Sequence, residues 1–449
     1  MLSDPIAALA TPPGRSALAL IRLSGRGAFE VAARALRPFR PDPARTVRRV
    51  RLVHPTTGEL VDDALAACFP APRTYTGDDL VEISTHGGLL VPAAAVAALV
   101  AAGARPAAPG EFTRRALLNG KLDLLQAEAT ADLIDAGSPA QARRALHQLD
   151  RGLSARLELL RAELLELEAL IAYDIDFPEE DEGPVAPERV ERAWRAARDR
   201  IAQLLATAPE GERLREGALV VIAGAPNAGK SSLFNALLGA ERAIVTEIPG
   251  TTRDAIEAHA VIEGFPFRLV DTAGLRDSDD RVEKLGVAVS RKYLGAADLV
   301  LFCEPGDEGR GTGEGAERFL AECTAPAVVV RTKGDLVPVP RPPSPVPVVS
   351  VVTGEGLAEL KRLLAQQAFG RLLRLGDVEP VVTRARHRVA LERALAEVDG
   401  FRAARAGGVD AAAAATHLRA AVGALDDLIG VVTPDDVLER VFASFCVGK

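Results

Sequence analysis

Aromatic residues and cysteines are scarce in this chain of 449 residues. Aromatics make up only 4% of it, while alanine, leucine and arginine, which are strong helix formers, are abundant, so we expect helix-rich packing. The four cysteines form no Cys-x-x-Cys pair and do not combine with the six histidines at metal-ligand spacing. This pattern predicts a reducing compartment and argues against structural disulfides or a zinc site.

A positive overall charge and long uncharged runs are also missing. The formal net charge is −8, so no overall basic field attracts nucleic acid, and any contact with RNA must use local patches. Residues 1–13 lack the charged-then-apolar pattern of a targeting sequence, and no uncharged run reaches membrane-spanning length. We therefore expect a cytoplasmic protein that does not enter a membrane.

The most specific motif present is a glycine-rich loop, Gly224–Ser232 (GAPNAGKSS). An apolar run precedes it and a helix-like segment follows, and this strand, turn and helix together make Gly-x4-Gly-Lys-Ser a nucleotide site. Backbone N–H groups would surround the β-phosphate, Lys230 would face the β and γ oxygens, and Ser231 would ligate Mg²⁺. The loop residues expected to bind nucleotide are Asn227, Ala228, Gly229, Lys230, Ser231 and Ser232.

Downstream motifs predict that the nucleotide is GTP. DTAG (271–274) follows a strand-like run, and GTTRD (250–254) is a switch segment whose Thr252 would complete the Mg²⁺ coordination. TKGD (332–335) follows another strand, and its Asp335 would accept from guanine N1 and N2, a donor pair that ATP lacks. The residues assigned in this way are Thr252, Asp271, Thr272, Ala273, Gly274, Thr332, Lys333 and Asp335.

Asn227 indicates how charge is neutralised during hydrolysis. Leu275, directly after DTAG, cannot orient water as a glutamine would. The carbonyl oxygen of Asn227 offers a ligand to a hard monovalent cation, which would take the part of an arginine finger. The alternative interpretation is a loop residue that hydrogen-bonds its own turn.

The chain as a whole predicts a multidomain protein: an α+β N-terminal domain, a helical domain, and an inserted α/β P-loop GTPase domain of the Ras-like type. Apolar residues from Leu153 to Ile171 recur at spacings of four and three, which predicts one buried face of a long helix. Helical sequence returns at 383–406, 411–429 and 434–444. The expected boundaries are 1–118 for the N-terminal domain, 119–215 and 371–449 for the two helical parts, and 216–370 for the nucleotide domain.

Several long strings resemble one known family. GAPNAGKSS, IPGTTRD (248–254), DTAGLRDSDDRVEKLG (271–286) and a terminal FCVGK (445–449) stand in the order typical of the MnmE (TrmE) tRNA-modification GTPases. ATPPGR near the N-terminus and PGEFTRRALLNGKLDLLQAEA (109–129) belong to the same pattern. The resemblance covers essentially the whole chain and implies the family's fold and activity.

The resemblance implies a potassium-stimulated GTPase. The loop asparagine would bind K⁺, the switch segment would fold over the ion, and two nucleotide domains would dimerise across these faces to hydrolyse GTP. The water-orienting glutamate falls on Glu283, which by itself looks like a solvated helix charge. The implied K⁺ ligands are Asn227, Thr246, Ile248 and Thr251, the Mg²⁺ ligands are Ser231 and Thr252, and the switch also includes Glu247, Pro249 and Gly250.

The resemblance further implies one-carbon chemistry on tRNA. The N-terminal domain would bind 5-formyl- or methylene-tetrahydrofolate, with Glu82 on the pterin N–H edge and Arg22 and Lys121 on anionic or carbonyl groups. Lys449 would reach the same pocket, and the Cys446 thiol would act on the wobble uridine. From position alone these are ordinary surface charges and a half-buried cysteine. The implied partners are a second copy in a homodimer, an FAD-containing MnmG-type protein in a heterotetramer, and tRNA.

Base recognition departs from the family pattern at two places. Thr332 replaces the usual asparagine: it keeps a hydroxyl but loses the carboxamide that braces the phosphate loop and meets the base, so we expect a weaker affinity for the base. Ser350, Val351 and Val352 stand where the family has Ser-Ala-x, whose backbone N–H reads guanine O6. Two alternatives stay open: a GTP-regulated assembly switch without its own carbon chemistry, and an ATP-driven enzyme with a degenerate base motif.

Overall fold

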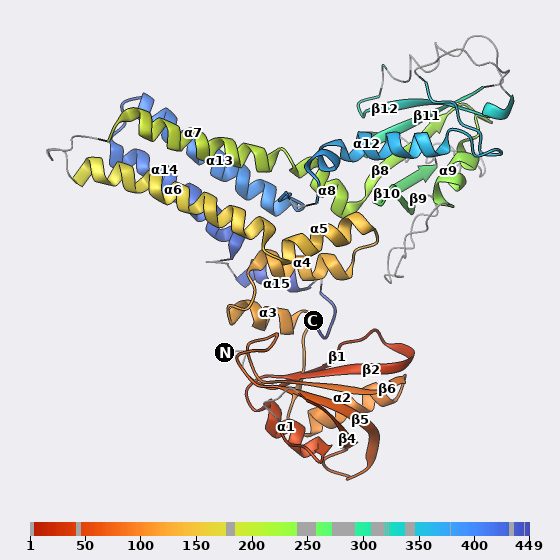
Figure 1. The fold of residues 1–449 in the computed structure, drawn as a ribbon, viewed down its shortest axis with the longest axis vertical. Coiled ribbons are helices and arrows are strands. Elements are labelled where there is room, and N and C mark those ends of the chain that lie inside the picture. Colours follow the sequence, from red (N-terminus) through yellow and green to blue (C-terminus); the bar gives the residue numbers. More distant parts are fainter. Residues whose placement is uncertain are drawn as a thin grey trace. The chain divides into compact units, whose positions relative to one another are not determined.

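The computed structural model describes residues 4–41, 46–176, 185–239, 257–271, 292–306, 319, 321, 323–336, 346–377, 379–430, 435–443 and 445–449. The chain divides into two compact units. The first contains Met1–Ala131 and Asp426–Lys449, and the second contains Asp132–Leu425 (Figure 1). Within the described ranges, no helix combines the length and the apolar character needed to cross a membrane.

The first unit is built on a seven-stranded sheet with the order β3-β4-β5-β6-β2-β1-β7. Its neighbours pair antiparallel except β1 and β7. Alternate residues along β4 and β5 are buried, which is the pattern of a sheet with one face on a core. The strands are β1 (Ile6–Leu9), β2 (Gly14–Ser24), β3 (Leu36–Arg37), β4 (Val47–Val53), β5 (Leu60–Phe69), β6 (Leu80–Gly88) and β7 (Arg105–Pro106).

Two helices, α1 (Ala28–Ala35) and α2 (Val91–Ala101), cover one face of this sheet (Figure 1). Their small apolar residues close a core with β-branched and leucine side chains of the strands. Three further helices are α3 (Glu111–Leu118), α4 (Leu124–Ile134) and α15 (Asp435–Ala443). A separate cluster joins Leu124 and Ala127 of α4 to Leu438, Phe442 and Phe445, so the last residues of the chain pack on its N-terminal part.

The second unit begins with long helices. Helix α6 (Gly152–Asp176) contains the apolar residues that recur at spacings of four and three, and each of them is at most 2% exposed. They are Leu153, Leu157, Leu160, Leu164, Leu167 and Ile171. This confirms the predicted helix and its buried face. The indole of Trp194 on α7 donates to the carbonyl of Val398 on α13 at 2.9 Å. The other helices here are α5 (Pro139–Leu149), α7 (Pro187–Leu205), α8 (Ala208–Glu216), α13 (Ala385–Ala406) and α14 (Ala411–Ile429).

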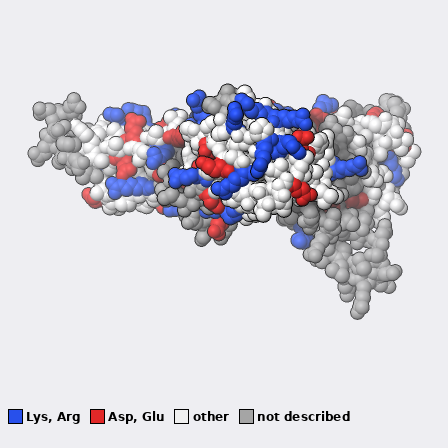
Figure 2. All heavy atoms as spheres, turned by 90° about the horizontal axis from the view of Figure 1, so that it is seen from below, with Lys and Arg blue, Asp and Glu red and all other residues white. Residues whose placement is uncertain are grey.

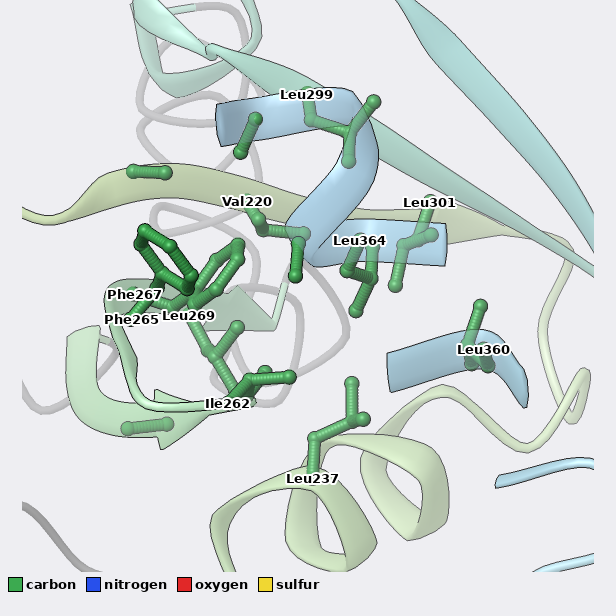
Figure 3. Close-up of a cluster of buried hydrophobic side chains, with 14 of the residues drawn as sticks. Val220, Leu237, Ile262, Phe265, Phe267, Leu269, Leu299, Leu301, Leu360 and Leu364 are labelled. Atoms are coloured by element: carbon green, nitrogen blue, oxygen red, sulfur yellow. The ribbon is translucent and has the colours of Figure 1, made fainter. Parts of the chain in front are cut away.

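A five-stranded sheet in the second unit has the order β12-β11-β8-β10-β9, with β9 antiparallel at the edge. Its central strand β8 is buried from Ala218 to Ala223, as expected for a parallel strand covered on both faces. Figure 3 shows the core between this sheet and helices α9 (Lys230–Leu238) and α12 (Leu357–Leu375). The strands are β8 (Ala218–Gly224), β9 (Glu257–Ile262), β10 (Phe265–Asp271), β11 (Leu299–Pro305) and β12 (Ala327–Thr332).

Helix α12 is kinked at Phe369, whose φ of −134° and ψ of 26° are not helical. The buried Phe369 ring stacks on Phe265 (4.7 Å between centroids) and meets Phe267 edge-on (5.5 Å). Beyond the kink, Glu210 of α8 accepts hydrogen bonds from the N–H groups of Arg371 (3.1 Å) and Leu372 (2.8 Å), which caps the second half of the helix. The α+β, helical and α/β parts of the predicted fold class are thus all present.

Candidate nucleotide-binding site

The turn after β8 has the backbone shape that a phosphate-binding loop requires. Gly224 has a φ of 140°, and a Cβ there would lie 2.3 Å from the carbonyl oxygen of Cys303, so only glycine fits against β11. Asn227 (φ 62°) and Gly229 (φ 75°) are left-handed, which curls the loop before α9 starts at Lys230. Strand, turn and helix N-terminus therefore stand in the predicted order.

Two side chains at the start of α9 face the loop and the neighbouring strand. The ammonium of Lys230 donates to the carbonyls of Gly224 (3.1 Å) and Ala225 (2.7 Å), and the side chain is almost fully buried. The hydroxyl of Ser231 donates to Oδ2 of Asp271, the last residue of β10, at 2.6 Å. A hydroxyl and a buried carboxylate converging on one point provide the oxygen ligands that Mg²⁺ prefers, so these residues fit that ion.

Thr332 contacts the phosphate loop directly. Its hydroxyl lies 2.7 Å from the carbonyl oxygen of Ala228 and 3.1 Å from that of Glu304, and donates its single proton to one of them at a time. Thr332 is 2% exposed, and a Cβ added at Gly229 would sit 3.4 Å from its side chain. Thr332 has no carboxamide, but the hydroxyl that it keeps makes a contact to the loop in its place. The expected weaker affinity for the base stays a prediction.

The base side of the site contains Asp335 and Ser350. The side chain of Ser350, 1% exposed, donates to Oδ1 of Asp335 at 2.7 Å and accepts from the N–H of Thr353 at 3.1 Å. Asp335 itself lies at the surface, where a base can reach it. After Ser350, Val351 is half-buried and Val352 is exposed. Lys333, between Thr332 and Asp335, has a left-handed φ of 54°.

Asn227 lies within the phosphate loop and is exposed. A left-handed φ is tolerated better by asparagine than by most residues, which is a local reason for its presence. Within the described part of the chain its amide makes no hydrogen bond, so the alternative of a bond to its own turn has no counterpart there. Its carbonyl oxygen fits a hard cation in chemistry, since such ions prefer oxygen ligands.

Several predicted site residues lie outside the described residues. They are Thr246, Glu247, Ile248, Pro249, Gly250, Thr251, Thr252, Thr272, Ala273, Gly274 and Glu283. Their roles stay predictions.

In the first unit, three residues singled out from the sequence come together. Nε of Arg22 pairs with Oε1 of Glu82 at 3.0 Å, and the same guanidinium donates to the carbonyl of Gly448 at 3.4 Å. Burial, and then the positive charge of Arg22, lower the pKa of Lys449, although Glu82 acts in the opposite direction. Cys446 is exposed nearby in the chain. Lys121 donates instead to the carbonyl of Pro72 at 3.0 Å.

Sequence reasoning missed two features beside these residues. The Arg22 guanidinium stands 5.6 Å from the ring centre of Tyr75, a cation–π geometry. Glu111 accepts from Arg105 (2.7 Å) and Arg115 (2.9 Å), and Arg115 is 1% exposed. Glu111 and Arg115 stand four residues apart on α3, a spacing that could have predicted their pair. The distant member is Asp4, which pairs with Arg105 (2.8 Å) and Arg115 (3.1 Å) and which no local pattern indicates.

A cavity of about 250 Å³ lies in the second unit, between α5, the end of α8 and the start of α13. Arg144 donates there to the carbonyls of Gly376 (2.9 Å), Asp377 (3.4 Å) and Glu379, and burial lowers its pKa. The amide nitrogen of Gln148 is buried without a hydrogen-bond partner. None of the phosphate-loop residues lines this cavity, so it is separate from the nucleotide site.

Three features define a P-loop GTPase. They are the glycine loop between a strand and a helix, the serine bonded to the buried aspartate of the neighbouring strand β10, and the exposed aspartate on the base side. Family models match in two places: "MnmE helical domain" over residues 124–446 and "GTP-binding protein TrmE N-terminus" over residues 5–121. The chain belongs to the MnmE family of tRNA modification GTPases.

Relatives and solved structures give the degree of similarity. The chain is 44% identical to a tRNA modification GTPase MnmE of Thermus thermophilus, over 100% of this chain and 99% of that protein. It is 45% identical to the MnmE of Methylorubrum populi, over 99% and 98%. A crystal structure of the G domain of the T. maritima FeoB iron transporter is 28% identical, covers 34% of this chain and 98% of its own, and has a TM-score of 0.24.

Proposed function

We propose that this chain hydrolyses GTP with stimulation by potassium and thereby helps to modify the wobble uridine of certain tRNAs. An FAD-containing partner would act with it, and an aminomethyl or carboxymethylaminomethyl group would be added to C5 with a folate-borne one-carbon unit. The observation that carries the GTPase part is the meeting of Ser231 and Asp271 at 2.6 Å beside a loop that Thr332 braces. The rest of the proposal is supported by membership of the MnmE family.

Each nucleotide-site residue that the structure describes would have one task in hydrolysis. Lys230 exchanges its two carbonyl partners for oxygens of the β- and γ-phosphates, and the loop N–H groups bind the same anion. Asp335 accepts from the guanine edge, and its bond from Ser350 orients the carboxylate. Bound Mg²⁺ and K⁺ would spread negative charge in the transition state. The residues that would hold Mg²⁺ are Ser231, Asp271 and Thr252, those that would hold K⁺ are Asn227, Thr246, Ile248 and Thr251, and Glu283 would orient water.

The folate would bind in the first unit. The ion pair between Arg22 and Glu82 presents a carboxylate acceptor and a guanidinium donor together, which fits the mixed edge of a pterin. Lys449, whose pKa is lowered by burial and then by Arg22, would add an amine to this pocket, and Lys121 would bind the more distant part of the ligand. Cys446 is exposed and would attack an electron-poor carbon of the uridine. When bound, the folate supplies the carbon.

The proposed assembly is a homodimer through the N-terminal domain, joined to an FAD-containing MnmG-type partner in a heterotetramer in the cytoplasm. The boundaries 1–118, 119–215, 216–370 and 371–449 belong to the same proposal. Rearrangement of the switch segments would pass from the nucleotide domain to the helices that flank it in sequence.

A GTPase assay in KCl and in NaCl, with and without the FAD-containing partner, tests the proposal. We expect faster turnover in KCl and modification of tRNA only with the partner present. Equal turnover in both salts would contradict the potassium part, and no turnover in either would overturn the whole proposal. If turnover persists but the full-length protein fails to bind titrated tetrahydrofolate, the chain is a GTP-regulated assembly switch instead.

A further inference from the structure

One stretch of the first unit is strongly basic although the chain as a whole is acidic. Between Val31 and Gly58, the described residues contain six arginines and no lysine, aspartate or glutamate, and all six arginines are exposed. In Figure 2, which looks from below onto the part of Figure 1 that carries β4 and β5, blue atoms gather across the middle of the view. Because the net charge of the chain is negative, we expect any contact with RNA to use a local basic patch of this kind.

The pairing of β3 with β4 brings three of these arginines to one face of the sheet. Arg37 and Arg51 are directly opposite each other in the antiparallel register. Val50 and Leu52 point into the core under α1 and α2, so Arg49 and Arg51, at alternate positions, share the opposite face of the sheet. We call Arg37, Arg49 and Arg51, together with the exposed Arg40 that follows β3 in the chain, the arginine surface. Arg48, at the alternate position with Val50 and Leu52, is not part of it.

Among the described residues, Asp63 supplies the carboxylate that pairs with this surface. Asp63 is the register partner of Arg51 on β5, yet its carboxylate pairs with Arg49 at 3.1 Å. Arg37, Arg40 and Arg51 form no ion pair or hydrogen bond with other described residues. Like charges directly opposite in a sheet are destabilising, so the Arg37–Arg51 pair lowers the stability of the free protein and would be stabilised by an anion bound between them.

We propose that the arginine surface binds the phosphate backbone of tRNA. The inference rests on the proposed function and names the surface that this function requires. Guanidinium groups bind phosphate oxygens bidentately, and the surface contains arginine without any lysine. Contacts of this kind are independent of base sequence and orient a folded RNA on the protein. The arginine surface therefore positions the tRNA, while the reacting base is recognised elsewhere.

Fluorescence anisotropy with the full-length chain and an unmodified tRNA transcript tests this proposal across about 50 to 200 mM NaCl. The test variant is Arg37→Gln/Arg40→Gln/Arg51→Gln. The control variant, Arg192→Gln/Arg374→Gln/Arg405→Gln, removes the same charge from exposed arginines of the second unit. We expect the test variant to bind at least about tenfold more weakly, with a log–log salt slope smaller by roughly 2 to 3. The control should match the wild type, and both variants should keep the wild-type GTPase rate without tRNA.

Several results would overturn the proposal. Wild-type affinity and slope in the test variant, or an equal loss in the control, would show that the arginine surface has no specific part in binding. A change from dimer to monomer in sedimentation would assign it to contact with a second copy, and binding of vesicles rich in phosphatidylserine in place of RNA would assign it to lipid. If the test variant binds normally while tRNA is still modified, only the surface is wrong. If the wild-type protein neither binds nor modifies tRNA, the proposed function fails as well.

Discussion

The hydroxyl of Thr332 lies 2.7 Å from the carbonyl oxygen of Ala228, so the end of β12 is tied to the middle of the phosphate loop. Ala228 is fully buried, and its carbonyl has no access to water that would replace this donor. The identity of the residue at 332 therefore bears on phosphate binding as well as on the base.

Replacement of Thr332 by valine keeps the shape of the side chain and removes the donor. A buried carbonyl left without a partner costs about 1–3 kcal/mol, and we expect the affinity for GDP to fall about tenfold. Titration with a fluorescent guanine nucleotide measures this. Thr416→Val removes an exposed hydroxyl on α14, which donates to Ala413, and should leave the affinity unchanged. Wild-type affinity in Thr332→Val would show that the brace is dispensable.

Asn227 allows the side chain and the backbone to be tested separately. Asn227→Ala removes the proposed potassium ligand but strains a left-handed residue, whereas Asn227→Gly removes the ligand without strain. We expect both variants to lose the difference between KCl and NaCl in the GTPase rate and to keep most of their affinity for nucleotide. Potassium stimulation that survives in Asn227→Gly would remove this side chain from the cation site.

Cys446→Ser separates hydrolysis from modification. The residue is exposed, and serine preserves its size while lowering its nucleophilicity. The variant should hydrolyse GTP at the wild-type rate and, with the FAD-containing partner, should give no modified uridine in nucleoside analysis. Cys323→Ser, a change at a half-buried cysteine, is the matched control and should be fully active. Normal modification by Cys446→Ser would make the thiol structural.

Glu111 predicts how the first unit responds to acid. Burial raises the pKa of Glu111, but the donors from Arg105, the Ala108 N–H and Arg115 outweigh it and hold the pKa below its ordinary 4.5. The resulting stabilisation is present above pH 4.5 and is lost as the pH falls through the lowered pKa. Glu111→Gln removes the buried one of the two carboxylates that pair with Arg115, while the more exposed Asp4 stays in place at 3.1 Å. A buried ion pair that loses one partner costs roughly 3–5 kcal/mol, and we expect a smaller loss here because Asp4 remains.

Hydrogen exchange of peptides from β1 and α3 measures this effect, because it reports the stability of the region without requiring the whole chain to unfold in one step. Glu111→Gln should exchange faster than the wild type at pH 7, and this difference should shrink in acid. Glu30→Gln, a change of an exposed residue on α1, should exchange like the wild type. A difference between Glu111→Gln and wild type that does not depend on pH would contradict the assigned role of the carboxylate.

The elements that sequence predicted well are those with strong local signals. The periodic leucines of α6 and the glycine loop before α9 specify their own conformation through spacing and backbone freedom. The short strands β1, β3 and β7 were not predicted, because two to four residues are too few to show an alternating pattern. The pairing of β7 also depends on β1, which is distant in the sequence.

The features missed at the sites have a related cause. In the ion-pair cluster of Glu111, the spacing of four residues to Arg115 was a usable signal, but Asp4 joins Arg105 and Arg115 only through folding. The hydroxyl brace of Thr332 depends on how closely β12 approaches the loop, a distance that residue type alone does not give.

The kink at Phe369 also bears on how the nucleotide domain can be produced by itself. The core that holds Phe265, Phe267 and Phe369 also contains residues from outside the range 216–370. Leu214 precedes this range in the sequence, and Leu372 and Val381 follow it. A recombinant fragment cut at 216 and 370 would lose these leucine and valine side chains and the Glu210 cap, and would expose aromatic rings to water. Expression from 208 to 382 keeps them, so the longer fragment is the better material for nucleotide titrations.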